Sequence, residues 1–376
     1  MKNVFLTGGT GTIGSALVPR LLADGDTVLT LLIRARDDAD LHARLAEMLA
    51  YWQYQPGDSR ASRIRALRGD ISLPQFGVGD AGFAQLASEI THIIHCAASV
   101  KLNMELEQAR ATAVTPTRTV LDLGRRCAQA RTLRKIDMVS TVGVWGRTPG
   151  HMPERRLPEV SDFHNTYEAA KAEAERVIWN EGADLPVTVH RPSMVVGETG
   201  SGRVMHFQVF YHLCEFLSGA RTYGVMPELG HTHLDTVPVD WVADVIQWSS
   251  GHEDTAGQIF HLCSGPDEAI SLKSLQQRVR RTWQSHGRKL PALRQVNRSL
   301  LERLVPVIGA LAGEKARRAL RALPPILAYL AEDQGFSNPR TAQALAAAGL
   351  PVPPVDSYLD AVLGFYLDSS AEQPAA

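Results

Sequence analysis

The first fourteen residues constrain this chain more than any other stretch. A short apolar run, Val4 to Leu6, is typical of a buried parallel strand, and glycines follow at positions 8, 11 and 14 before an apolar helical stretch begins. Gly8 permits a tight turn, Gly11 lets the backbone approach a phosphate, and Gly14 lets the helix pack closely on the strand. The helix N-terminus then presents free N–H groups to an anion. The order of strand, glycine turn, helix and second strand predicts a dinucleotide-binding unit.

Residues in and around this turn are therefore the first predicted cofactor contacts: Thr7, Gly8, Thr10, Gly11, Thr12, Ile13 and Gly14. The second strand, Thr27 to Ile33, ends at Arg34, where an NAD-binding protein usually has an acidic residue for the ribose hydroxyls. The arginine favours NADPH. Arg34, and Arg44 on the helix that follows, can hold the 2′-phosphate through charge-assisted hydrogen bonds. The alternative for Arg44 is a solvated charge on a helix surface.

The next two strands supply further candidate contacts at their carboxyl ends. A short strand closes on Asp70 and Ile71, beside the expected position of the adenine. Asp70 can accept a hydrogen bond from the adenine amino group while Ile71 packs on the ring, although a simple turn aspartate is the rival interpretation. Ala97 and Ala98 end the following strand, and their small side chains leave space for a cofactor.

A phenol and an ammonium stand one helical turn apart at Tyr167 and Lys171, the only tyrosine–lysine pair in the chain with this spacing. A lysine beside a phenol favours the phenolate, so we expect Lys171 to move the pKa of Tyr167 toward neutrality and to bind the nicotinamide ribose. Thr141, at the end of the preceding strand, can join Tyr167 in binding a carbonyl oxygen. These three residues are the predicted catalytic set.

With these motifs in order, the chain resembles the short-chain dehydrogenase/reductase superfamily, and specifically its extended branch. The motifs are Thr7-Gly8-x-x-Gly11-x-x-Gly14, Gly69-Asp70, Val139-Ser140-Thr141, Tyr167-x-x-x-Lys171, Arg191-Pro192-Ser193 and Val239-Asp240. Leu32-Ile33-Arg34-Ala35 with Arg44-Leu45, and the stretch from Gly69 to Gly77, are similar to the acyl-thioester reductases, which include fatty acyl-CoA reductases and terminal reductase domains of peptide synthetases. The resemblance implies that Arg34 and Arg44 bind the 2′-phosphate and that Pro192 and Ser193 contact the cofactor.

These observations predict an α/β fold: a Rossmann-type doubly wound parallel sheet with a smaller, mainly helical C-terminal substrate domain. We expect residues 1–198 and 234–264 to form the NADP-binding domain, and residues 199–233 and 265–376 the substrate region. The hydrophobic fraction of 44% suits a packed core, and 39 basic against 40 acidic residues give no reason to expect a nucleic-acid partner.

The substrate region carries weaker signals. Residues 300–330 have an amphipathic composition that can cap an acyl pocket, dock a partner or touch an anionic membrane. His231-x-His233 lacks an identifiable third ligand, so no metal is predicted. The four cysteines are widely spaced and are expected to be reduced. Because the chain opens directly into a strand and has no membrane-length apolar run, we expect a cytoplasmic protein.

Together the signals predict NADPH-dependent reduction of an acyl thioester, CoA-linked or bound to an acyl carrier protein, to an aldehyde and then to an alcohol if a second reduction follows. An NADP-dependent ketone or hydroxysteroid-type dehydrogenase is the alternative, since it would use the same three residues. A nucleotide-sugar epimerase or dehydratase is disfavoured by the apolar character of the substrate region, and a non-catalytic NADP-binding scaffold by the intact catalytic set.

Overall fold

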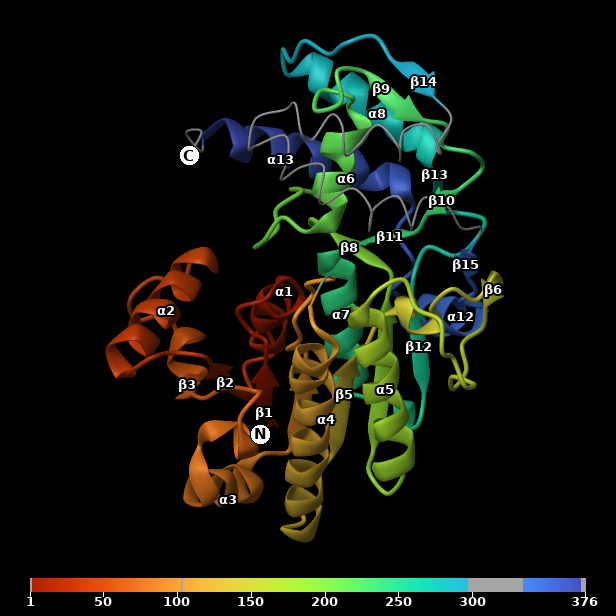
Figure 1. Ribbon diagram of the computed structural model, residues 1–376. Helices are drawn as coiled ribbons and strands as arrows, with labels where there is room; N and C mark the ends of the chain where they lie inside the picture. The colour runs from red at the N-terminus through yellow and green to blue at the C-terminus, as the bar shows by residue number, and fades with distance from the viewer. Residues whose placement is uncertain (1, 103, 297–333, 373–376) are drawn as a thin grey trace.

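The computed structural model describes residues 2–102, 104–296 and 334–372, and its centre is a parallel sheet with helices on both faces (Figure 1). The seven strands lie in the order β12-β7-β5-β4-β1-β2-β3, which confirms the predicted doubly wound α/β fold. Their bounds are β1 (Lys2–Thr7), β2 (Thr27–Ile33), β3 (Ile64–Arg68), β4 (His92–His95), β5 (Lys135–Val139), β7 (Val187–Pro192) and β12 (Ile259–Leu262).

Two groups of helices bury the sheet. One core joins it to α1 (Thr12–Leu21), α2 (Asp38–Tyr51) and α7 (Val239–Ser250). The opposite core joins it to α3 (Gly79–Glu89), α4 (Leu106–Gln129) and α5 (Thr166–Glu181), which stand in front of the sheet in Figure 1. Burial on both faces explains why the strands read as continuous apolar runs rather than as alternating patterns.

A smaller lobe lies beyond the carboxyl ends of the strands. Its core packs α6 (Val209–Leu217), α8 (Leu272–Ser285) and α13 (Leu359–Glu372) around aromatic residues such as Phe210, Tyr211 and Trp283. Short strand pairs surround this core: β8 (Met194–Val196) with β11 (Thr236–Pro238), β9 (Val225–Pro227) with β14 (Arg294–Val296), and β10 (His233–Leu234) with β13 (Ile270–Ser271).

The last described stretch returns to the main sheet before it reaches the smaller lobe. β15 (Gln334–Phe336) pairs with β6 (Gly150–Met152), and α12 (Pro339–Ala347) packs on β12. Leu345 of α12 is fully buried in the core of the sheet. This part of the structure differs from the division drawn from the sequence, which assigns all of 265–376 to the substrate region, because α12 buries its apolar side on the Rossmann core.

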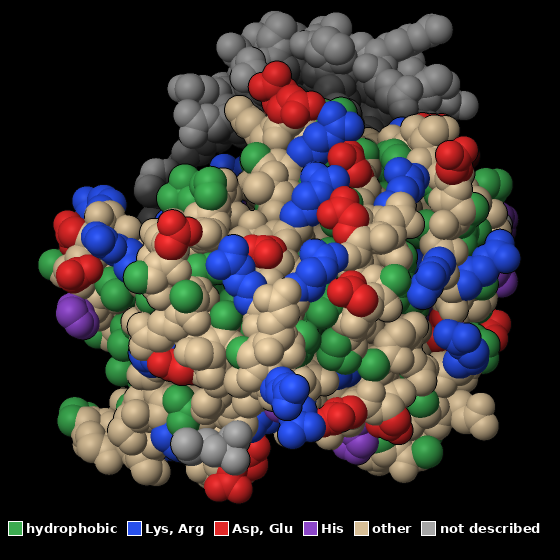
Figure 2. Space-filling view, turned by 90° about the horizontal axis from the view of Figure 1, so that it is seen from below, with side chains coloured by type: hydrophobic (Ala, Val, Ile, Leu, Met, Phe, Trp, Pro, Cys, Tyr) green, Lys and Arg blue, Asp and Glu red, His purple; other side chains and the backbone are tan. Residues whose placement is uncertain are grey.

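The face at the amino ends of the strands carries charges of both signs (Figure 2). Basic and acidic side chains are interspersed there, and surface ion pairs join α4 to α5 (Arg118 with Glu181) and to the loop after α5 (Arg125 with Asp184). Exposed pairs of this kind contribute little stability individually. They leave no extended field of one sign on this face.

Candidate functional site

The glycine turn between β1 and α1 has the geometry that a phosphate cradle needs. Gly8 adopts φ +78°, and a Cβ there would lie 2.6 Å from the backbone nitrogen of Ala97. A Cβ on Gly14 would lie 2.1 Å from the Gly8 carbonyl oxygen, so both positions require glycine. A Cβ on Gly11, by contrast, would meet only that carbonyl oxygen, at 3.2 Å. The turn therefore leaves its backbone open where α1 begins, and it fits a pyrophosphate.

A cavity of about 900 Å³ opens from this turn, at the carboxyl ends of the strands. It brings together the predicted glycine turn and the predicted catalytic set, which come from positions far apart in the sequence. The predicted residues that line it are Gly8, Gly11, Thr12, Ile13, Gly14, Ala98, Thr141, Tyr167, Lys171, Pro192 and Ser193. Parallel strands of an α/β sheet place their ligands at this edge.

The other predicted cofactor residues lie outside the lining of this cavity. Thr7 is fully buried, and its hydroxyl lies 2.8 Å from His95 Nδ1, which joins β1 to β4. Ala97 backs the glycine turn and donates its N–H to Thr7 Oγ1 at 3.4 Å. Thr10 is half-buried, and its carbonyl oxygen lies 3.2 Å from His206 Nε2 of the smaller lobe. Thr7 and Ala97 therefore contact the glycine turn from the strands beneath it, and Thr10 contacts the smaller lobe.

Arg34 and Arg44 meet at the carboxyl end of β2. The exposed Arg34 follows the strand directly, and the Arg44 guanidinium donates to the Arg34 carbonyl oxygen. Arg34 is also close enough to Asp70 to lower the pKa of its carboxyl. Burial alone would raise that pKa, but two hydrogen bonds from Ser72 and the charge of Arg34 outweigh burial. Arg34, Arg44 and Asp70 thus lie near one another at the carboxyl end of β2. The Asp70 carboxylate accepts hydrogen bonds within the turn after β3, and Ile71 packs against the hydrophobic core.

The predicted catalytic residues come from the end of β5 and the start of α5. Thr141 Oγ1 accepts a hydrogen bond from Gly143 N at 3.2 Å, which fixes the turn after β5. Tyr167 and Lys171 project from one side of α5 into the same cavity, and Tyr167 is hydrogen-bonded to Thr141. The Lys171 ammonium donates to the Val139 carbonyl oxygen at 2.9 Å. Each side chain is thus held by the strand end.

The pKa of Tyr167 moves in the direction opposite to the one expected from the sequence. Burial and the nearby charge of Glu168 raise the pKa of Tyr167 to about 12, and the hydrogen bond with Thr141 offsets this only in part. Lys171 does not reverse the shift, because its ammonium is directed to Val139 and burial lowers its own pKa to about 8. At neutral pH Tyr167 is therefore a neutral phenol and can donate a proton.

Two groups near the site were not found from the sequence. The buried carboxylate of Glu168 accepts a hydrogen bond from His164 N at 3.0 Å and lies 2.8 Å from His164 Nδ1, and both side chains line the cavity. The signal was present: Asn165 caps α5, and Glu168 stands three residues later, a capping-box spacing. Glu175, four residues after Lys171, forms a buried ion pair with Arg191.

The rest of the cavity, formed by residues outside the predicted set, has a mixed wall. Apolar side chains line it beside histidines and carboxylates from separate segments: Met194, Phe207, Phe210, Leu234 and Phe336, with His151, His212, His233, Asp235 and Asp267. The sequence suggested an apolar region, and the polar members come from β6, α6, β10 and two loops, whose proximity no local pattern reveals. Burial raises the pKa of Asp235 to about 6, although its carboxylate accepts hydrogen bonds from the amides of Ser264 and Gly265.

The structure also bears on the predictions about metal ions, cysteines and the membrane. Across the described ranges, no group of three or more histidine, cysteine, aspartate or glutamate side chains is arranged to hold a metal ion. The four cysteines are unpaired. Among the helices described, none is long and apolar enough to cross a membrane. The amphipathic stretch 300–330 lies outside the described residues.

Comparison with known proteins identifies the family. A family model described as male sterility protein, an NAD-binding family, matches residues 6–246. The chain belongs to this family. Membership confirms the predicted resemblance to the extended branch of the short-chain dehydrogenase/reductases.

The proteins that this chain resembles include reductases. The isonitrile lipopeptide synthase of Streptomyces coeruleorubidus is 29% identical over 70% of this chain and 18% of that protein. The fatty acyl-CoA reductase wat of Drosophila melanogaster is 27% identical over 52% of this chain and 43% of that protein. The solved terminal R domain from the myxalamid PKS-NRPS pathway superposes with a TM-score of 0.80 at 25% identity, covering 98% of this chain and 90% of that one.

This chain therefore spans less than half the length of either curated relative, whereas it matches the isolated R domain almost end to end. The family is NAD-binding, and reductases are among the relatives that this chain resembles.

Proposed function

We propose that this protein is an NADPH-dependent reductase of acyl thioesters that releases an aldehyde. The observation that carries the proposal is the single cavity that joins the glycine turn to Thr141, Tyr167 and Lys171 and continues into a partly apolar pocket. The fatty acyl-CoA reductase and the PKS-NRPS terminal domain among its relatives support a thioester as the substrate. A CoA ester and a carrier-protein ester are both candidates.

NADPH fits the residues at the nucleotide end of the site. The open backbone at Gly11 and the start of α1 would hold the pyrophosphate. Arg34 and Arg44 would hold the 2′-phosphate, because the Arg34 guanidinium makes no hydrogen bond or ion pair within the described part of the chain. Asp70 and Ile71 lie at the same rim, at the expected adenine position.

The catalytic residues can then be assigned roles in reduction. When bound, the nicotinamide supplies a hydride to the carbonyl carbon of the thioester. Tyr167 and Thr141 bind the carbonyl oxygen, and Tyr167 donates its proton as negative charge develops there. The raised pKa of Tyr167 suits this direction, since the phenol must be protonated before hydride transfer. Lys171, held by Val139, contributes a positive charge and a donor for the nicotinamide ribose.

The test is a comparison of substrates under one assay. Purified protein is incubated with NADPH and with acyl-CoA esters of several chain lengths, matched pantetheine esters, and ketones and aldehydes of the same carbon skeletons. We expect NADPH oxidation with thioesters and an aldehyde product captured as its hydrazone. Turnover of ketones without turnover of any thioester would instead identify the alternative dehydrogenase.

Two variants serve as controls. Tyr167→Phe removes the proton donor with little change in volume, and we expect a loss of about 10² to 10⁴ in kcat. Thr141→Val tests the second hydroxyl in the same way. Full activity in Tyr167→Phe would contradict the assigned mechanism, even if thioesters are consumed.

A further inference from the structure

A short segment of the smaller lobe crosses to the glycine turn of the Rossmann domain. His206 Nε2 lies 3.2 Å from the Thr10 carbonyl oxygen, and Gln208 Nε2 donates to Thr12 Oγ1 at 2.9 Å. Because a carbonyl oxygen only accepts, the ring nitrogen of His206 is the donor. Residues 206–208, the strap, are thus bonded twice to the turn that fits a pyrophosphate, although each pair is separated by 196 positions in the sequence.

The side chains of the strap contact the two lobes in turn. The Phe207 ring packs edge-on against Tyr211, with ring centroids 4.8 Å apart, and against Tyr366, with centroids 4.9 Å apart. These contacts belong to the core of the smaller lobe. His206 and Gln208, on either side of Phe207, reach the glycine turn instead. Phe207 therefore anchors the strap in the smaller lobe while its neighbours bond to the cofactor end of the cavity.

The Gln208 side chain does not serve its own helix. Gln208 is the N-cap residue of α6, yet its side chain makes no capping hydrogen bond there. Its amide is used on Thr12, which is the first residue of α1. One hydrogen bond thus joins the starts of two helices, and both starts line the cavity beside Gly11. The positive end of each helix dipole favours an anion at this place.

The hydrogen bond from Gln208 restricts the direction in which the Thr12 hydroxyl donates. A hydroxyl has one proton and two acceptor lone pairs, and the amide of Gln208 occupies one of the lone pairs. Among the residues that the structure describes, none accepts the proton of the Thr12 hydroxyl. The Thr12 side chain is 7% exposed and lines the cavity. Its proton is therefore left to donate to a ligand at the turn.

From these contacts we propose that the strap completes the dinucleotide site, with Gln208 as a positioning residue that turns the Thr12 hydroxyl toward the bound pyrophosphate. Thr12 then donates to a phosphate oxygen, in addition to the backbone N–H groups at the start of α1. The strap contributes equally to the binding of NADPH and NADH, because the pyrophosphate is common to both. This inference rests on the dinucleotide part of the proposed function and does not depend on the thioester.

The experiment measures cofactor affinity rather than turnover. NADPH and NADH are titrated by nucleotide fluorescence against the wild type, Gln208→Leu, Thr12→Val and the double variant. Each change removes a polar group with little change in side-chain volume. We expect Gln208→Leu to weaken both cofactors about tenfold and Thr12→Val to weaken both about thirtyfold. The double variant should bind within about twofold of Thr12→Val, because Gln208 acts through Thr12.

Two controls test whether the strap is merely structural. The cofactor-free Gln208→Leu protein should melt near the wild-type temperature, because Gln208 makes no capping bond to α6. His206→Ala is the matched variant, since it removes the other bond of the strap and leaves the Gln208–Thr12 bond in place. It should weaken both cofactors less than Gln208→Leu does. An equal loss in the two variants would show that only the attachment of the strap matters, against a positioning role for Gln208.

The outcomes separate this inference from the proposed function. Unchanged affinity in Gln208→Leu, or losses that add fully in the double variant, would overturn the role of Gln208 while NADPH-dependent reduction stands. A wild-type preference for NADH would overturn the proposed cofactor, yet the loss in Gln208→Leu would still support this inference. If the wild-type protein binds neither dinucleotide, the proposed function fails and this inference fails with it.

Discussion

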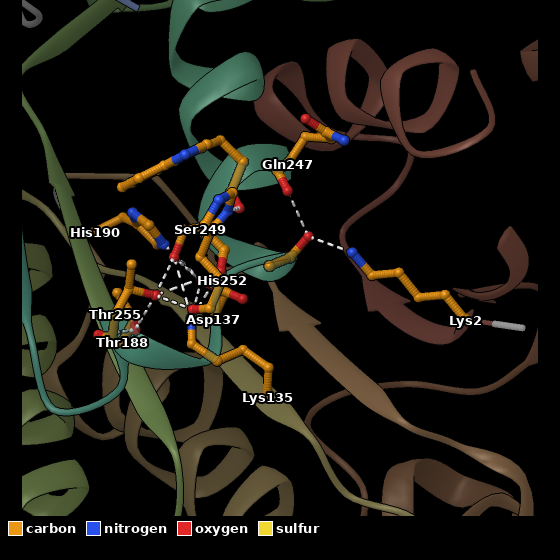
Figure 3. A network of polar contacts seen from close by, with 11 residues as sticks. Lys2, Lys135, Asp137, Thr188, His190, Gln247, Ser249, His252 and Thr255 are labelled. Atoms are coloured by element: carbon orange, nitrogen blue, oxygen red, sulfur yellow. Dashed lines mark hydrogen bonds and ion pairs between the residues drawn. The ribbon is translucent and has the colours of Figure 1, made fainter. Parts of the chain in front are cut away.

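The two faces of the central sheet each carry a buried network of charged side chains. On the face packed against α5, Arg191 donates to Glu175 through two nitrogens, and both side chains are fully buried. On the face packed against α7, Asp137 Oδ1 lies 3.2 Å from Lys135 Nζ and 2.8 Å from His190 Nε2 (Figure 3). β7 contributes to both networks, because the neighbouring residues His190 and Arg191 point to opposite faces of the strand.

The networks differ in what they hold. Glu175 accepts a hydrogen bond from Ser140 Oγ at 3.0 Å, beside Thr141, and its charge acts on Lys171. The network on the α7 face instead fastens the end of α7, because Ser249 Oγ donates to Asp137 at 2.7 Å and the Ser249 carbonyl oxygen accepts from Lys135. The comparison teaches that similar buried charges contact different parts of the molecule here: one set reaches Ser140 and Lys171 beside the cavity, and the other secures the end of α7.

Removal of Asp137 should give the largest effect on stability. Asp137→Ala leaves Lys135 buried without its carboxylate, and we expect a loss of about 3–5 kcal/mol in the free energy of unfolding. The kcat of the protein that remains folded should stay near the wild-type value. Denaturant unfolding and active-site titration measure the two quantities, and a large fall in kcat would abolish the contrast between the two networks.

The wild-type protein offers a related check at low pH. Burial would raise the pKa of Asp137, but the charge of Lys135 and the bond with His190 outweigh it and lower that pKa to about 2. A lowered carboxyl pKa contributes stability above its ordinary value of about 4 and loses it as pH falls toward 2. Asp137→Ala should lack this part of the acid transition.

Glu175→Gln tests the other network. The amide keeps the shape but loses the charge opposite Arg191, so we expect about 1.5–3 kcal/mol less stability, the range for hydrogen bonds to charged groups. Because Ser140 and Lys171 also respond to Glu175, kcat should fall about tenfold even in fully folded protein. Unchanged kcat in this variant would show that the Arg191–Glu175 network is structural alone.

The deprotonation of Lys171 should change activity and stability in opposite directions as pH rises. Its pKa is lowered to about 8 by burial, so the ammonium is lost as pH rises through 8, and kcat/KM should fall about tenfold by pH 9. The unfolded chain still binds that proton, so stability should rise over the same interval. A pH–rate profile beside unfolding curves measures both, and parallel declines would count against Lys171.

Arg34→Ala should give the smallest effect, because Arg34 is exposed and solvent screens its charge. We expect the affinity for NADPH to fall about fivefold to tenfold, equivalent to about 1 kcal/mol, with little change for NADH. Cofactor titration by fluorescence compares the two. An equal effect on both cofactors would remove Arg34 from the 2′-phosphate site.

Local patterns predicted the parts of the molecule whose determinants are adjacent in sequence. The glycine turn is one example, since Gly8 and Gly14 are required by contacts within a single turn. The second strand is another, with the same bounds in the sequence and in the structure. Tyr167 and Lys171 were recognised together because helical spacing alone brings them to one side of α5.

Predictions failed where burial sets a pKa, or where segments far apart in the sequence form a contact. The expected fall in the pKa of Tyr167 assumed a solvated pair, whereas burial and the contact of Lys171 with Val139 reverse its direction. Glu175 and Arg191 look like ordinary helix and strand charges until the fold places them together. The mixed wall of the cavity needs six separate segments, so no window of sequence contains it.

The return of α12 to the sheet has a consequence for synthesis of the chain. β12 is an edge strand, and its outer side is covered by residues that come much later: His261 N donates to Thr341 Oγ1 at 3.1 Å, and Asn338 donates to the Cys263 carbonyl oxygen at 2.6 Å. A nascent chain therefore presents an uncovered strand edge to its neighbours on the ribosome until those residues emerge. A truncation that ends shortly after β12 should consequently aggregate during expression, even though every strand of the sheet is present.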